Sequence, residues 1–192
     1  MKQMKFIGSL LMLFISIVLL VLAACSKADK DKIPITTKSK KAREYFVQGR
    51  DLFERLQAQE SLQYCQRAVA EDPDFAMGHL FLSYAVPSAK EFFENLDKAV
   101  ALAERVSEGE RLWILGVEAG THGMPIKQRE LYQRMVELYP RDERALTLLG
   151  NKFFDQQDWG QAVELYNQSV AINPNFSKPY NQFGYAHRFL GD

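Results

Sequence analysis

Residues 143–176 read ERALTLLGNKFFDQQDWGQAVELYNQSVAINPNF, and this stretch decides the fold. Its first half places Leu146, Leu149 and Phe153 three and four residues apart, which is the spacing of one face of an α-helix. Gly150 lies on the same face. Because glycine has no side chain, it marks a point where a second helix can approach closely.

The second half of the stretch predicts that second helix. Ala162 supplies a small residue to meet the glycine, and Tyr166 supplies an aromatic ring one turn later to cover it. Pro174 marks the end of the second helix, because proline cannot continue the intrahelical hydrogen bonds. The stretch is therefore expected to form a helical hairpin.

The same spacing recurs along the chain in steps of 33 or 34 residues. Glycine occupies four of the equivalent positions and serine occupies one: Gly49, Ser83, Gly116, Gly150 and Gly184. A proline follows three of these glycines at a distance of 24 residues, at Pro73, Pro140 and Pro174. Two coupled series of this kind indicate internal repeats, and a single hairpin needs its neighbours to bury its apolar face.

The pattern resembles the tetratricopeptide repeat (TPR) family from Ala42 to Asp192. The resemblance implies an all-α, right-handed superhelical solenoid of about four and a half helix–turn–helix repeats. The expected repeats are 42–75, 76–108, 109–142 and 143–176, followed by a partial repeat at 177–192.

The repeat at 76–108 departs most from the pattern, because Ser83 replaces the glycine and the closing proline is missing. Its second helix is expected to be extended, with one face formed by Leu96, Val100, Ala103 and Val106. Ser107 and Glu110 then predict a capping box, which would start the following helix by side-chain hydrogen bonding.

The first 25 residues have the form of an export signal. Lys2 and Lys5 precede an uncharged run at 6–24. The run ends Leu-Ala-Ala-Cys at residues 22–25, which resembles a bacterial lipobox. The resemblance implies that residues 1–24 are a signal peptide and that Cys25 becomes the lipid-bearing first residue of the mature protein. The alternative is an uncleaved anchor helix, since 19 residues at 1.5 Å each approach the roughly 30 Å hydrocarbon core.

Residues 25–41 are predicted to be the lipidated cysteine and a flexible basic linker. The stretch after Cys25 contains six lysines against two aspartates and has no hydrophobic periodicity, so a solvated spacer is expected. Attraction of this positive charge to anionic headgroups is the alternative. Ser26 follows the cysteine where lipoproteins retained in the inner membrane carry Asp. By resemblance, the outer membrane is favoured in a Gram-negative host, with the protein facing the periplasm or the cell surface.

In the TPR family, fixed positions of each repeat's first helix line a concave groove that binds peptides. Carried over to this chain, they are Phe46, Arg50, Phe53, Leu80, Tyr84, Trp113, Val117, Thr147, Asn151, Phe154, Asn181, Tyr185 and Arg188. Aromatic rings offer contact area to an extended peptide, and the polar groups can bond to its backbone. For each position, packing between repeats is the alternative. The carboxylate clamp of chaperone-binding members is matched well only at Asn151, so recognition of a free C-terminal carboxylate is not predicted.

Composition and motifs disfavour other classes of protein. The 192 residues carry 24 basic and 24 acidic side chains, and residues 42–192 are acidic on balance, with 16 against 22. Nucleic acid is therefore not an expected partner. The chain has no phosphate-binding loop, His-Glu-x-x-His or Cys-x-x-Cys motif, so no enzyme activity, metal or cofactor is predicted. Cys65 is interpreted as a small core residue.

The leading hypothesis is a membrane-anchored envelope lipoprotein that acts as a non-catalytic scaffold for one or more protein or peptide partners. A second hypothesis is that an aromatic groove of Tyr84, Trp113 and Tyr185 holds a glycan or another small ligand. A third is that the chain is the N-terminal part of a longer protein, because Gly191 and Asp192 occupy the turn that would lead into another helix.

Overall fold

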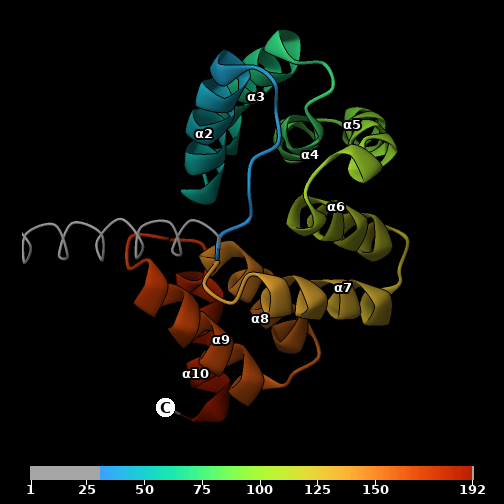
Figure 1. Cartoon of the computed structure of the whole chain (residues 1–192). Coiled ribbons are helices and arrows are strands. Elements are labelled where there is room, and N and C mark those ends of the chain that lie inside the picture. Colours follow the sequence, from blue (N-terminus) through green and yellow to red (C-terminus); the bar gives the residue numbers. More distant parts are fainter. Residues whose placement is uncertain (1–30, 192) are drawn as a thin grey trace, which may run out of the picture.

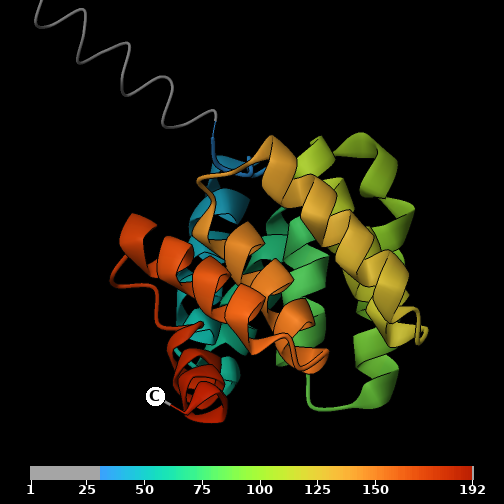
Figure 2. The same ribbon diagram turned by 90° about the horizontal axis from the view of Figure 1, so that it is seen from below.

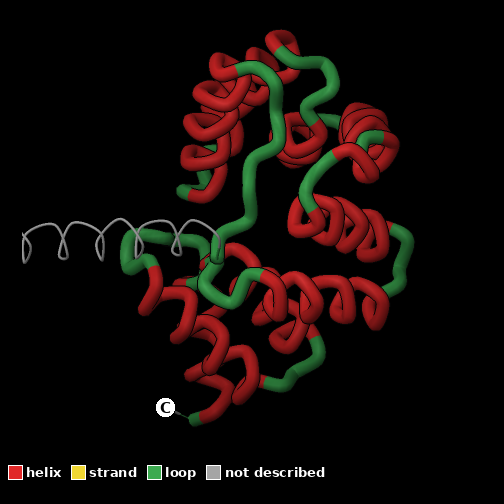
Figure 3. The backbone as a smooth tube through the Cα atoms, in the orientation of Figure 1, coloured by secondary structure: helices red, strands yellow, loops and turns green. Residues whose placement is uncertain are grey.

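The computed structural model describes residues 31–191, and within them it contains α-helices, one 3₁₀ turn and no strand (Figures 1 and 3). The α-helices of this part are α2 (Lys40–Glu54), α3 (Ala58–Glu71), α4 (Ala76–Ala85), α5 (Ala89–Ala101), α6 (Glu108–Thr121), α7 (Pro125–Leu138), α8 (Glu143–Asp155), α9 (Trp159–Ile172) and α10 (Tyr180–Leu190). The prediction of an all-α repeat fold is confirmed.

Consecutive helices pack as pairs, and the pairs stack in chain order. The pairs are α2 with α3, α4 with α5, α6 with α7, and α8 with α9, and α10 packs on α9. The stack curves, so that α2 and α8 approach each other across its inner side (Figures 1 and 2). A repeat solenoid of this kind buries one continuous core between neighbouring pairs.

Tyrosine rings lie directly over two of the repeat glycines. A Cβ atom added at Gly150 would lie 2.7 Å from Cε1 of Tyr166, and one added at Gly116 would lie 2.2 Å from Cε1 of Tyr132. Real Cβ atoms are not found this close to other heavy atoms. The glycines are thus needed for close helix approach, as the sequence predicted, although at Gly150 the tyrosine makes the contact and Ala162 is not among the nearest atoms.

The three repeat prolines follow helix ends, as predicted. The helices α3, α7 and α9 each end two residues before the prolines at 73, 140 and 174. At each end the backbone leaves the helical conformation, at Asp72, Tyr139 and Asn173. Proline stabilises such an ending, because it lacks the N–H that a continuing helix would need.

The second repeat corrects one prediction. Its second helix, α5, does not extend through Val106 but ends at Ala101, and a 3₁₀ turn at Ala103–Arg105 follows. The reason is the capping box at Ser107, which is present as predicted: the Ser107 N–H donates to Glu110 Oε2 at 3.1 Å, and the Glu110 N–H donates to Ser107 Oγ at 3.4 Å. The N-cap residue itself has an extended backbone, so the earlier helix cannot run through Ser107.

The basic linker is also corrected over its described part. Residues 31–39 are not a free spacer but lie along the repeats, from the start of α2 to the start of α8 (Figure 1). Helix α2 begins at Lys40 rather than beyond residue 41, because Ser39 Oγ accepts the Ala42 N–H at 3.1 Å and caps the helix.

The predicted signal peptide at 1–24 and the predicted lipid site at Cys25 lie outside the described residues. Among the helices of residues 31–191, none has the length and apolar character needed to cross a membrane.

Candidate functional site

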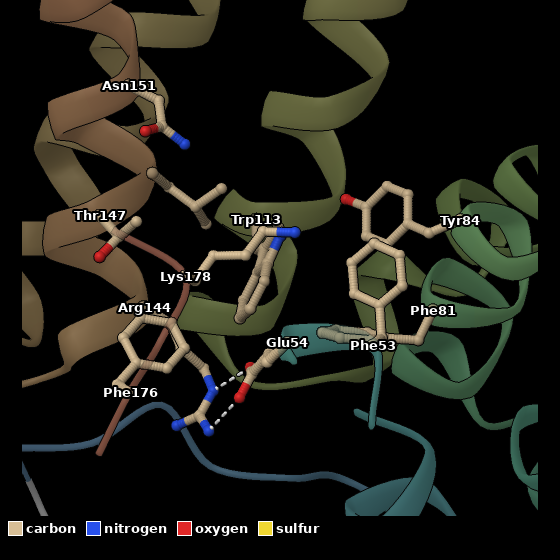
Figure 4. Close-up of a pocket in the computed structure, with 11 residues that line it drawn as sticks. Phe53, Glu54, Phe81, Tyr84, Trp113, Arg144, Thr147, Asn151, Phe176 and Lys178 are labelled. Carbon is tan, nitrogen blue, oxygen red and sulfur yellow. Dashed lines mark hydrogen bonds and ion pairs between the residues drawn. The ribbon is translucent and has the colours of Figure 1, made fainter. Parts of the chain in front are cut away.

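A pocket of about 190 Å³ opens on the inner side of the curved stack (Figure 4). The first helices of all four pairs contribute to it, together with the segment between α9 and α10. Its lining residues are Phe53, Glu54, Phe81, Tyr84, Trp113, Arg144, Thr147, Leu148, Asn151, Phe176 and Lys178. The pocket thus lies on the surface that the TPR resemblance marks as concave.

Five of the predicted groove residues meet in this pocket. They come from four helices that are far apart in the sequence: Phe53, Tyr84, Trp113, Thr147 and Asn151. The repeat register therefore placed residues from every complete repeat at one site.

The other predicted groove residues lie elsewhere. Phe46 and Leu80 are 1% and 0% exposed, so the prediction that they face a ligand is wrong in this structure. Phe46 packs edge to face against Phe75 and Phe81, at centroid distances of 5.0 and 5.2 Å. These ring contacts, together with the notch lined by residues 33–35, cover Phe46, so it is not open to the solvent in this structure.

Six further predicted residues are outside the pocket. Arg50 Nη2 lies 3.2 Å from Asp51 Oδ1, and Val117 packs against the core. The ring centroids of Phe154 and Trp159 are 4.9 Å apart. The remaining three are exposed on α10: Asn181, Tyr185 and Arg188. Since Tyr185 lies outside the pocket, the aromatic set proposed for a glycan is not assembled as one surface.

An aromatic wall forms one side of the pocket. Phe53 stacks on Tyr84 with a centroid distance of 5.3 Å, and Phe81 meets Trp113 edge to face at 5.6 Å. Burial raises the pKa of the Tyr84 phenol well above its ordinary value of 10.0, and the neighbouring Trp113 indole N–H counteracts part of that rise. The wall is therefore uncharged at neutral pH.

Trp113 is the most informative residue of the wall. Its side chain is 6% exposed, and its buried Nε1 has no hydrogen-bond partner of normal geometry among the described residues. Figure 4 shows Nε1 on the side of the ring that faces Tyr84. A buried N–H without a partner costs free energy, but this one faces the Tyr84 phenol and is closed to the solvent. A ligand oxygen would reach it only when the Tyr84 ring moves aside.

The opposite side of the pocket is polar and comes from α8. Thr147 Oγ1 donates to the Glu143 backbone carbonyl at 2.8 Å, so its donor is already used. Asn151 Oδ1 accepts the Tyr166 hydroxyl at 2.8 Å, and Figure 4 shows its Nδ2 on the pocket side of the amide. Asn151 can therefore donate to a ligand carbonyl facing Trp113.

An ion pair between the first and fourth repeats closes one end of the pocket. Arg144 Nε lies 2.6 Å from Glu54 Oε1, and Arg144 Nη2 lies 2.8 Å from Glu54 Oε2. Burial alone would lower the pKa of Arg144, but this two-bonded contact raises it above its ordinary value. The Arg144 and Glu54 side chains are 15% and 10% exposed, so the pair joins α2 to α8 in a largely buried position.

The segment after α9 completes the closure. Ser177 Oγ donates to the Glu54 backbone carbonyl at 3.0 Å, and Lys178 Nζ lies 4.3 Å from the centroid of the Phe53 ring. Burial lowers the pKa of Lys178, and Glu54 opposes this change. The inner surface is thus a closed pocket at this end and not an open trough.

Sequence reasoning missed the other six residues that line the pocket. They are Glu54, Phe81, Arg144, Leu148, Phe176 and Lys178, none of which occupies a position that the resemblance assigns to the groove. Only an opposite-charge pair at Glu54 and Arg144 could have pointed to them, and these residues are 90 positions apart. No local pattern connects side chains at that separation.

The titratable residues offer little chemistry at the site. Among residues 31–191, no group of three or more His, Cys, Asp or Glu is arranged to hold a metal ion. His79 is buried, with its ring nitrogens 3.2 Å from Asn95 Oδ1 and 2.9 Å from the Pro73 carbonyl oxygen, which is a core role. The expectation that the chain has no catalytic function stays a prediction.

Comparisons with known proteins support the TPR class. Residues 150–191 match the TPR repeat family model. No curated protein matches the chain. Among solved structures, TTC0263, a thermophilic TPR protein of Thermus thermophilus, is similar with a TM-score of 0.52 and 14% identity, covering 78% of this chain and 82% of that one.

A second similar structure is the "APC/C hetero-tetramer Cut9–Hcn1", with a TM-score of 0.51 and 17% identity. It aligns with 79% of this chain, which spans 30% of the length of that one. At these identities the likeness shows the fold alone. The family match and the fold together support a TPR protein.

Proposed function

We propose that this protein is a non-catalytic scaffold that binds an extended peptide segment of a partner protein on its inner surface. The observation that carries the proposal is the convergence of groove residues from four repeats on one pocket, whose wall contains the buried Trp113 N–H without a hydrogen bond of normal geometry. A peptide offers both a carbonyl oxygen for that N–H and a side chain for the aromatic wall.

The size of the pocket favours a peptide side chain over a larger ligand. Pockets that enclose a drug-sized molecule measure roughly 300–1,000 Å³. An apolar cavity of roughly 150 Å³ can hold a single benzene ring. At about 190 Å³ the pocket matches one aromatic or large aliphatic side chain, with the rest of the peptide outside. A glycan would have to bind elsewhere or by opening the Glu54–Arg144 closure.

The membrane anchor is part of the proposal and rests on residues 22–25. If Cys25 carries lipid, the scaffold is held at an envelope membrane through residues 26–31, because residue 33 is already bonded to the repeats. Six extended residues span at most about 21 Å. Loss of radioactive palmitate from a Cys25→Ala variant tests this part, and unchanged labelling would rule it out.

Selection of peptides from a random display library on the detergent-solubilised full chain tests the binding function. A Trp113→Phe variant keeps a ring in the wall but loses the N–H, so a selected peptide should bind about fivefold more weakly, in line with one hydrogen bond. Trp159→Phe is the matched control, because Trp159 lies outside the pocket, against Phe154 and Phe189.

The two variants decide the result together. Weaker binding by Trp113→Phe alone supports the pocket. Failure to select any saturable peptide, or an equal effect of both substitutions, contradicts it.

A further inference from the structure

The N-terminal segment 32–38 is bound to the repeats through three backbone N–H groups and through the side chains of Lys32, Thr36 and Thr37. The N–H groups of Ile33, Thr36 and Lys38 donate to Asp142 Oδ2 at 2.9 Å, Glu110 Oε1 at 2.7 Å and Asp72 Oδ2 at 3.2 Å. The three acceptors lie at three successive boundaries between repeats. An extended chain that donates its backbone N–H groups to a row of carboxylates is the arrangement of a bound peptide.

Each carboxylate of this row serves the repeat and the segment at once. At Asp142, Oδ1 caps helix α8 by accepting the N–H groups of Arg144 and Ala145 at 2.9 and 3.0 Å, while Oδ2 accepts from Ile33. At Asp72, Oδ1 accepts the Asp74 N–H at 3.2 Å, and Oδ2 faces the segment. In both aspartates the repeat itself uses only Oδ1, so Oδ2 can accept a hydrogen bond from the backbone of a ligand.

Glu110 is the central member of the row and is fully buried. Its Oε2 accepts Ser107 Oγ at 2.7 Å within the capping box and also bonds to the Thr36 hydroxyl. A buried carboxylate needs partners, and here the segment provides two of them. The seat of the segment is thus part of the core and not a surface patch.

Side chains of the segment add selectivity. Ile33 and Ile35 pack against the hydrophobic core, and with Pro34 they line a small notch beside Phe46 and Trp113. Lys32 forms an ion pair with Glu143, whose side chain is 5% exposed. The bound sequence therefore has a basic residue, two apolar residues flanking a proline, and threonine.

We propose that the row formed by Asp72, Glu110 and Asp142 is a second peptide-binding site, that residues 32–38 occupy it as an intramolecular ligand, and that a partner peptide of the same chemistry displaces them. The Trp113 ring borders both this site and the Trp113 N–H pocket, but none of the three carboxylates lines that pocket. The proposal therefore does not depend on the function proposed for the pocket. Its ligand is an extended chain with a basic–apolar–Pro–apolar–Thr pattern.

Attachment to the same chain makes the segment a strong competitor. A ligand on a short linker has an effective concentration of about 1 mM. If a free copy of the segment binds with a dissociation constant near 1 µM, the attached copy would weaken an equal competitor about 1,000-fold. Occupancy by a partner therefore requires tighter binding or withdrawal of the segment.

The test uses a fluorescein-labelled peptide with the sequence of residues 31–39 and the full chain in detergent. In an Ile33→Asp/Thr36→Pro variant, the attached segment loses its apolar anchor and one N–H donor, and the new carboxylate is repelled by Asp142. By fluorescence anisotropy, the peptide should bind this released variant at least about 100-fold more tightly than the unaltered chain. A peptide with the same two substitutions should not bind.

A matched pair of aspartates locates the site. Asp142→Asn, added to the released variant, keeps the helix cap through Oδ1 but places an amide donor against the Ile33 N–H, so peptide affinity should fall about tenfold. Asp158→Asn is the control, because Asp158 caps α9 and makes no contact with the segment. Equal losses in the two variants would assign the effect to helix capping and overturn the proposal.

The proposal also fails if a released variant with native circular dichroism binds no peptide, or if it binds no more tightly than the unaltered chain. Should that variant not fold, hydrogen exchange of the unaltered chain decides. Protected amides at Ile33, Thr36 and Lys38 support the bound segment, and exchange at free-peptide rates refutes it. Asp142→Asn and Asp158→Asn change no residue that lines the Trp113 N–H pocket, so the two proposals can fail separately.

Discussion

The fourth helix pair, α8 and α9, and the second pair, α4 and α5, divide the space between their helices in opposite ways. In the fourth pair, Gly150 lies beneath the ring of Tyr166. In the second pair the equivalent positions, also 16 residues apart, hold Ser83 and Ala99, and both are buried. In these two pairs, glycine lies opposite a large residue and serine lies opposite a small one.

The other two pairs extend the comparison. The third pair has the same glycine–tyrosine contact as the fourth, between Gly116 and Tyr132. The first pair is intermediate: a Cβ atom added at Gly49 would lie 2.9 Å from Sγ of Cys65. The sizes of the two facing side chains therefore compensate for each other. The space between two packed helices is filled densely and tolerates neither a void nor an overlap.

Removing the large partner should have the largest effect. Tyr132→Ala deletes a fully buried ring and leaves a cavity over Gly116, so we expect the free energy of unfolding to fall by about 3–5 kcal/mol. The equivalent change in the second pair, Ala99→Gly, removes one methyl group and should cost about 1 kcal/mol. Urea unfolding followed by circular dichroism measures both, and similar losses would show that the pairs do not differ as described.

Enlarging the small partner should have an intermediate effect. Gly150→Leu forces a side chain into the Tyr166 ring and should destabilise the domain by about 1–3 kcal/mol. Gly184→Ala is the matched control, since no atom lies within 4 Å of the added Cβ, and it should stabilise α10 by up to about 1 kcal/mol. An unchanged melting midpoint for Gly150→Leu would refute the contact.

The intermediate pair predicts the smallest effect, which depends on pH. Burial raises the pKa of the Cys65 thiol from 9.0 to about 12. The thiol has a higher pKa in the folded chain than in the unfolded chain, so its contribution to the free energy of unfolding is complete below pH 9.0. The contribution is lost as the pH rises from 9.0 toward the folded-state pKa, because the unfolded chain loses its proton first. Between pH 8 and pH 10, Cys65→Ala should therefore lose about 1 kcal/mol less stability than the unaltered chain. Parallel pH profiles in thermal unfolding would mean that Cys65 is not buried against Gly49.

Features set by neighbouring residues could be read from the sequence. The helix ends before the repeat prolines, the capping box at Ser107 and the close contacts at Gly116 and Gly150 all depend on residues less than one repeat apart. The extended second helix of the second repeat was wrong because two local signals conflict there. Apolar spacing continues through Val106, but the cap at Ser107 requires the chain to leave the helix first.

The candidate site was predicted only in part, because many of its contacts join residues that are more than one repeat apart. The register placed Phe53, Tyr84 and Trp113 on the inner surface, because every repeat presents the same helix face. It also placed Phe46 there, which lies in the core, since a position in a repeat does not specify what packs on it. The acceptors of residues 32–38 gave no local signal: the lysines predicted a solvated linker, whereas the backbone N–H groups hold the segment.

The sequence by itself determined the period of the repeats, the helix pairs and the close helix contact at the repeat glycines, because each depends on contacts within about 34 residues. Only the tertiary structure decided that α2 meets α8 through Glu54 and Arg144 and that Thr36 reaches Glu110, 74 residues away. The physical reason is that small rotations between successive pairs add up along the stack. Their sum determines which distant side chains come within bonding distance.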